Sequence, residues 1–93
     1  MQLTHVPGKK AGNIVIYALS TCPWCKKTKA LLRDNGIEYD YVDVDLLAGE
    51  DRQTVMKTVE KWNPNVSFPV IVIDDQNCIV GFDEEKIKKT LNL

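Results

Sequence analysis

The apolar residues of this chain fall into short groups whose spacing alternates between that of strands and that of helices. The almost unbroken β-branched run at residues 14–18 predicts a strand covered on both faces, at the centre of a sheet. Residues 37–44 are rich in aromatic and β-branched side chains and predict a second strand. Residues 70–73 and 78–80, which flank a polar turn, predict a hairpin.

Helical spacing separates these strands. Pro23 suits the first position of a helix, and the side chains that follow repeat at one-face spacing until Gly36 stops the helix. A second amphipathic helix begins near Gly49 and ends where Asn63 precedes a proline. Acidic residues at 83–85 favour the start of a short closing helix, because negative charge is stabilised at a helix N-terminus.

The order of these elements is strand, helix, strand, helix, strand, strand, helix. It predicts a single α/β domain over residues 14–93, with a four-stranded mixed sheet flanked by three helices. Residues 1–13 contain Pro7, Gly8 and Gly12 and predict a turn-rich lead-in segment, to which no function is assigned.

Composition and charge limit the classes of binding partner and the cellular compartment that we expect. The 93 residues carry 12 basic and 13 acidic side chains, a net charge of −1, so no field of the whole domain favours nucleic acid or an anionic membrane. The sequence has no run of about 20 apolar residues, and its first residues lack the apolar stretch of a secretory signal. We therefore expect a cytoplasmic monomer without nucleic-acid or membrane partners.

Two of the three cysteines, Cys22 and Cys25, form a Cys-x-x-Cys motif where the first helix is expected to begin. If Cys22 caps this helix, its sulfur faces the unpaired backbone N–H groups of Trp24 and Cys25. These donors and the positive end of the helix favour a thiolate. Cys22 is therefore the predicted nucleophile.

Cys25 lies one helical turn further along the chain and is the predicted resolving thiol. When Cys22 is joined to a substrate sulfur, attack by Cys25 releases the reduced substrate and leaves a Cys22–Cys25 disulfide. A separate reductase must then open this disulfide. The disulfide is the only redox group that we expect, with no bound cofactor.

Cys-x-x-Cys is also half of a structural zinc site, which ordinarily needs a second spaced pair of ligands. Cys78 and His5 each stand alone, so we expect no metal. A single cysteine in an apolar strand is usually a small hydrophobic residue, and Cys78 is interpreted in this way. His5 is interpreted as a surface residue.

Three motifs occur in the order found in a known family: VIYALSTCPWC at residues 15–25, SFPV at 67–70 and VGFD at 80–83. Over about residues 13–93 the chain resembles the glutaredoxins and NrdH-type redoxins of the thioredoxin superfamily. The resemblance implies a thioredoxin-like fold and a protein-disulfide oxidoreductase. It also implies a cis peptide bond before Pro69, placed opposite the cysteines, with Phe68 offering backbone groups to an extended substrate.

Two positions depart from glutaredoxins that use glutathione. Leu19 stands where such proteins usually carry a lysine, and Gly81-Phe82-Asp83 replaces a Gly-Gly pair followed by acidic residues. Without that cation a glutathione carboxylate loses a partner. The resemblance is then to NrdH-type redoxins, which supply electrons to ribonucleotide reductase and are recycled by a thioredoxin-reductase-type enzyme.

Three alternatives remain open on the sequence alone: a glutathione-dependent glutaredoxin, an iron-sulfur cluster carrier that uses Cys22 from two chains, and a redox-inactive interaction module. Trp24 is expected to contact a partner, and Phe82 either lines the groove or packs beneath it. The predicted site thus has a catalytic pair, Cys22 and Cys25, and a substrate groove formed by Pro23, Trp24, Phe68, Pro69, Gly81 and Phe82.

Overall fold

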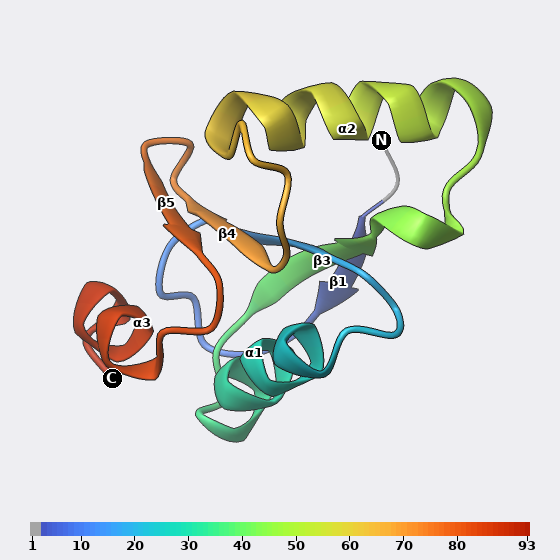
Figure 1. Ribbon diagram of the computed structural model, residues 1–93. Coiled ribbons are helices and arrows are strands. Elements are labelled where there is room, and N and C mark those ends of the chain that lie inside the picture. Colours follow the sequence, from blue (N-terminus) through green and yellow to red (C-terminus); the bar gives the residue numbers. More distant parts are fainter. Residues whose placement is uncertain (1–2) are drawn as a thin grey trace.

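The run at residues 14–18 forms strand β2 (Ile14–Ala18), which lies at the centre of a five-stranded mixed sheet (Figure 1). The computed structural model describes residues 3–93. β2 pairs in parallel with β3 (Tyr39–Asp43) and antiparallel with β4 (Val70–Ile73), which continues into β5 (Asn77–Val80). The expected central strand and hairpin are confirmed.

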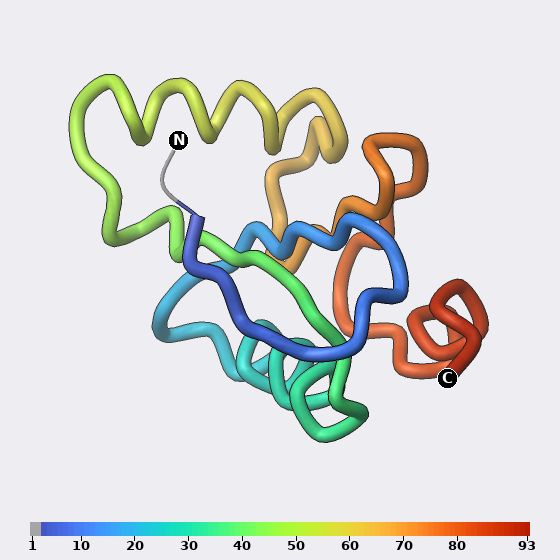
Figure 2. Tube along the Cα trace, turned by 180° about the vertical axis from the view of Figure 1, so that it is seen from behind, coloured from blue at the N-terminus to red at the C-terminus, as the bar shows by residue number. Residues whose placement is uncertain are grey.

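The lead-in segment adds a fifth strand that the sequence analysis did not predict. β1 (Thr4–Val6) pairs antiparallel with the outer side of β3, so the sheet has the order β1-β3-β2-β4-β5. Figure 2 shows this segment running alongside β3. Three residues directly before Pro7 carry too little alternation to reveal a strand. Met1 and Gln2 of the lead-in lie outside the described residues.

A close backbone approach holds the rest of the lead-in against the sheet. Lys9 donates a backbone hydrogen bond to Gly36 over 2.7 Å and accepts one from Glu38 over 2.9 Å. A Cβ atom at Gly8 would lie 2.7 Å from the Gly36 carbonyl oxygen, so a larger residue would push the segment away. The glycine therefore permits this docking.

Three α-helices cover the two faces of the sheet. α1 (Pro23–Asp34) and α3 (Glu84–Leu91) lie on one face, and α2 (Gly49–Trp62) lies on the other (Figure 1). A short 3-10 helix, η1 (Val44–Leu46), joins β3 to the segment before α2. No helix among residues 3–93 is long and apolar enough to cross a membrane.

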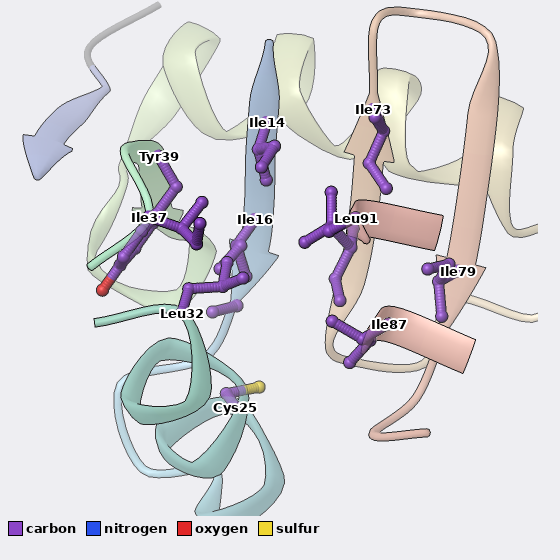
Figure 3. Packing of buried hydrophobic residues seen from close by; sticks show 12 residues of the cluster. Ile14, Ile16, Cys25, Leu32, Ile37, Tyr39, Ile73, Ile79, Ile87 and Leu91 are labelled. Atoms are coloured by element: carbon purple, nitrogen blue, oxygen red, sulfur yellow. The ribbon is translucent and has the colours of Figure 1, made fainter. Parts of the chain in front are cut away.

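The central strands explain why both faces need covering. In β2, Ile14 and Ile16 pack towards α1 and α3, whereas Tyr17 packs towards α2. β4 repeats this alternation, with isoleucines on the first side and valines on the second. Figure 3 shows the core on the α1 and α3 side of the sheet, with Cys25 of α1 below Leu32 and Ile16 in this view. Cys25 is thus part of the hydrophobic core.

Candidate active site

Cys22 is the N-cap of α1, as the sequence predicts. Its backbone is extended (φ −84°, ψ 115°), and Pro23 occupies the first turn of the helix. The Cys25 backbone N–H donates to the Cys22 sulfur over 3.2 Å, which satisfies one of the unpaired donors of the helix start. Cys22 is partly exposed, and all three cysteines are free thiols. A thiolate here has a donor in place and access to solvent.

Cys25 has the opposite environment, since none of its surface is exposed. Burial, followed by a side-chain hydrogen bond with Cys22, raises the pKa of Cys25 to about 12. A backbone hydrogen bond at Leu19 and the charge of Lys29 act in the opposite direction. At neutral pH the Cys25 side chain is therefore a protonated thiol.

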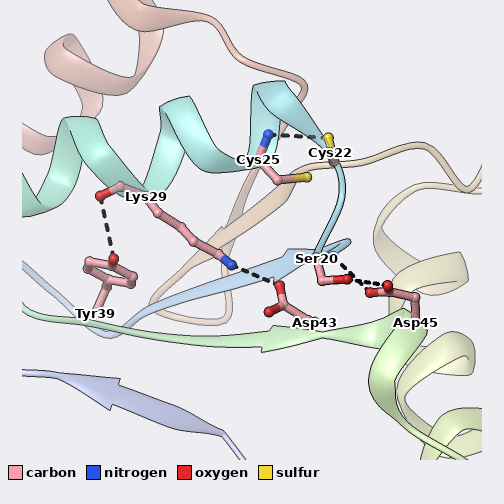
Figure 4. A network of polar contacts seen from close by, with 7 residues as sticks. All are labelled: Ser20, Cys22, Cys25, Lys29, Tyr39, Asp43 and Asp45. Atoms are coloured by element: carbon pink, nitrogen blue, oxygen red, sulfur yellow. Dashed lines mark hydrogen bonds and ion pairs between the residues drawn. The ribbon is translucent and has the colours of Figure 1, made fainter.

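The loop that leads to Cys22 is fastened by a carboxylate that the sequence analysis missed. Asp45 of η1 accepts the Ser20 backbone N–H over 2.8 Å with one oxygen and the Ser20 hydroxyl with the other (Figure 4). The hydroxyl bond, followed by the backbone bond, holds the pKa of the Asp45 carboxyl below its usual value. Because the two residues are 25 apart in sequence, no local pattern reveals this contact.

A second half-buried carboxylate, Asp43, lies at the end of β3. It pairs with Lys29 of α1, with 2.8 Å between Nζ and Oδ1, and the two side chains are only 18% and 16% exposed. The Lys29 ammonium also lies 4.1 Å from the centre of the Tyr41 ring. The sequence analysis did not predict this ion pair. The available signal was the position of Lys29, four residues after Cys25 on the same helix.

The Phe68–Pro69 peptide bond is cis, as the resemblance implied. Pro69 is fully buried, and its carbonyl oxygen accepts a hydrogen bond from the Gly81 backbone N–H over 2.8 Å. Cys22, Phe68 and Phe82 all pack against the core cluster that contains Cys25. The structure thus joins the Pro69 and Gly81 segments beside the core that carries the cysteines.

Trp24 and Phe82 come together from the starts of two different helices. Their rings stack with centroids 5.9 Å apart and an angle of 24° between planes. Trp24 remains 54% exposed, and the Lys27 ammonium lies 4.5 Å from the centre of its ring. Sequence left Phe82 either lining a groove or packing beneath it, and the structure places its ring against Trp24.

The contacts of Cys78 and His5 are with residues outside this centre. The Cys78 thiol donates to the Trp62 carbonyl oxygen over 3.8 Å, and burial raises its pKa. His5 contacts Glu38 over 3.2 Å and Asp40 over 2.8 Å, on the surface of β1 and β3. Within residues 3–93 no group of three metal-ligating side chains is assembled.

Comparison with known proteins identifies the family. The family model for glutaredoxin matches residues 14–79, most of the described chain. The chain belongs to the glutaredoxin family. It is 41% identical over 78 residues to a glutaredoxin-like 8.6 kDa protein in the rubredoxin operon of Clostridium pasteurianum, covering 84% of this chain and 96% of that protein.

Solved glutaredoxin structures agree with this assignment. The glutaredoxin of Methanosarcina mazei Go1 shares 45% identity and a TM-score of 0.90, over 100% of this chain and 90% of that chain. The methanoredoxin of Methanosarcina acetivorans shares 49% identity and a TM-score of 0.89, over 92% and 90% of the two chains. The chain is a glutaredoxin-like redox protein with a thioredoxin-like fold, and members of its family are thiol oxidoreductases.

Proposed function

We propose that this glutaredoxin is a dithiol reductase of protein disulfides, in which Cys22 attacks and Cys25 resolves. The observation that carries the proposal is the helix start itself, where the partly exposed Cys22 sulfur accepts the Cys25 backbone N–H over 3.2 Å. The donor stabilises negative charge on the sulfur that a substrate reaches. The buried Cys25 lies one helical turn further along α1.

Two exchange steps complete the reduction. The Cys22 thiolate attacks one sulfur of the substrate disulfide, forms a mixed disulfide, and releases the other sulfur as a thiolate. Cys25 then loses its proton and attacks the Cys22 sulfur, so the bond from Cys22 to substrate breaks and the second substrate sulfur leaves with the electron pair. The substrate gains two electrons, and the protein is left with a Cys22–Cys25 disulfide.

The environment of Cys25 supports this order. Burial raises its pKa, and so do the hydrogen bond and the negative charge contributed by Cys22. The two Cys22 contributions disappear when that sulfur enters a mixed disulfide, because it then carries neither charge nor a free thiolate acceptor. Cys25 is thus held protonated until a substrate has been captured, and it ionises more readily afterwards.

We propose that the surface beside the cysteines binds an extended segment of the substrate protein. Trp24 is exposed and stacked on Phe82, which provides a flat apolar surface next to Pro23. Phe68 and Gly81, which are partly exposed, are proposed to contact the substrate on the other side, with Phe68 offering main-chain groups, whereas Pro69 is fully buried and supports them from inside the fold. Protein partners are favoured, because exposed aromatic side chains are typical of protein interfaces.

The proposed reductant is a thioredoxin-reductase-type enzyme, as for NrdH-type redoxins, and ribonucleotide reductase is the proposed target class. Leu19 supports this choice, since it packs against the core on the α2 side and provides no cation for a glutathione carboxylate. We further infer that the protein works in the cytoplasm as a monomer.

The test compares two recycling systems on the disulfide form. NADPH with a thioredoxin-type reductase should sustain reduction of insulin by this protein, whereas glutathione with glutathione reductase should support only slow turnover. If glutathione alone sustains turnover, the protein is a glutathione-dependent glutaredoxin and the assignment based on Leu19 is wrong. The variant Leu19→Lys sharpens the comparison, because restoring the cation should increase turnover with glutathione.

A further inference from the structure

The ammonium group of Lys29 is fixed on the inner side of α1. Asp43 holds it at 2.8 Å, the Tyr41 ring lies 4.1 Å from it, and the lysine side chain is 18% exposed. Lysine side chains are almost never buried without a partner, and confining one costs conformational entropy and desolvation. The position of this charge is therefore set by the packing between α1 and β3.

Lys29 lies on the same face of α1 as Cys25. The two residues are four apart, which makes them neighbours on a helix. Figure 4 shows both side chains leaving α1 on the side that faces the sheet. Lys26 and Lys27 on the same helix are exposed instead. One lysine of this helix is thus directed inwards, beside the buried thiol.

A positive charge near Cys25 favours the resolving step. Cys25 must carry negative charge when it attacks, and burial disfavours the charged form. Burial and Cys22 raise the pKa of Cys25, and the charge of Lys29 lowers it. The two carboxylates at this end of the sheet have partners of their own: Asp43 pairs with Lys29, and Asp45 binds Ser20.

We propose that Lys29 is a positioning residue of the resolving step: its ammonium, held by Asp43 and the Tyr41 ring, stabilises the Cys25 thiolate as that thiolate attacks Cys22. The proposal rests on the dithiol function proposed above. In this step Cys25 gives up its proton, the Cys25–Cys22 bond forms, the bond from Cys22 to substrate breaks, and the departing substrate sulfur takes the electron pair and a proton. Lys29 keeps its own proton throughout.

The experiment separates the two exchange steps with dithiobis(nitrobenzoate), an aromatic disulfide. Each exchange step releases one coloured aromatic thiol from this reagent. One equivalent is mixed rapidly with the reduced protein. Attack by Cys22 releases the first coloured thiol, and attack by Cys25 on the mixed disulfide releases the second. The rate of each phase is measured as a function of pH for the wild type and for each variant.

Lys29→Gln should slow the second phase about tenfold near neutral pH and move its midpoint about one unit upwards, since one pKa unit changes the thiolate fraction about tenfold. The first phase should stay within about twofold of the wild type. Lys29→Arg, which keeps the charge, should restore the second phase. Lys57→Gln removes an exposed lysine from α2 and controls for the change in net charge.

Asp43→Asn tests whether the effect of Lys29→Gln comes from the lost charge of Lys29 or from the lost structural contribution of the ion pair. It removes the negative charge, but the asparagine amide oxygen can still accept a hydrogen bond from the ammonium beside Tyr41, so its second phase should be no slower than about half the wild-type rate. The proposal is overturned if Asp43→Asn slows this phase as much as Lys29→Gln, or if Lys29→Gln leaves the midpoint unmoved. Absence of the first phase in the wild type would instead contradict the dithiol function.

Discussion

The two sides of the redox centre differ in how they are built. The outer side holds Cys22 and the stacked rings of Trp24 and Phe82, which meet solvent. The inner side holds Cys25, with Lys29 on the same face of α1, and is closed to solvent. The same thiol chemistry thus occurs in two environments, three residues apart.

This difference supports the separate tasks that we propose for the two thiols. An exposed sulfur with a backbone donor is suited to attack on a disulfide that arrives from solution. A buried thiol with a pKa near 12 is unreactive towards outside reagents but lies beside the sulfur that we propose it attacks. Under this proposal, burial protects Cys25 from side reactions until Cys22 has been captured.

The largest expected effect comes from the outer thiol. Cys22→Ser should abolish reduction of insulin and of small disulfides, because a serine hydroxyl does not form the nucleophile at neutral pH. Cys78→Ser is the matched control, since its thiol contacts the Trp62 carbonyl at the end of α2, and it should retain wild-type turnover. Residual turnover in Cys22→Ser would show that Cys25 can act alone.

Replacement of the inner thiol should give a different defect. Cys25→Ser should still attack a disulfide through Cys22 but should stop at the mixed disulfide, because no second thiol releases the substrate. Mass spectrometry of the intact protein should then show one substrate thiol bound to each chain. Full turnover by this variant on protein disulfides would be incompatible with a resolving role for Cys25.

The exposed aromatic surface should affect binding more than chemistry. Trp24→Ala removes the ring that stacks on Phe82, and should lower kcat/KM for a protein disulfide about tenfold, mainly through KM, because interface tryptophans are often worth about 1–2 kcal/mol or more. Turnover of a small aromatic disulfide should change much less. Equal losses on both substrates would mean that the ring supports the helix start rather than a partner.

The effect that is smallest at neutral pH is on stability, because it develops only at high pH. The pKa of Cys25 is raised from 9.0 in the unfolded chain to about 12 in the fold, so its contribution to the free energy of unfolding is fully present below pH 9.0 and is lost as pH rises towards 12. The loss is at most about 1.4 kcal/mol per pH unit. Chemical denaturation of the reduced protein across this window should show the loss, and Cys25→Ala should lack it.

Several elements follow from local sequence alone. The β-branched run of β2, Pro23 at the start of α1 and the acidic start of α3 each depend on the periodicity or charge of adjacent residues. The two cysteines sit in such an element, so their positions at the helix start were predicted correctly. The edge strand β1 was not, because it is short and is defined by its pairing with β3.

The contacts around the cysteines were decided by the tertiary structure. Ser20 meets Asp45, Lys29 meets Asp43, and Trp24 meets Phe82 only because the ends of β2, β3 and β5 converge at one end of the sheet. The sequence contains 13 acidic residues, and nothing in their spacing says which of them lies beside a given serine or lysine. Sequence thus determined the reactive pair and the helix that presents it. Packing determined which charges and rings surround each sulfur, because such partners are selected by distance in space.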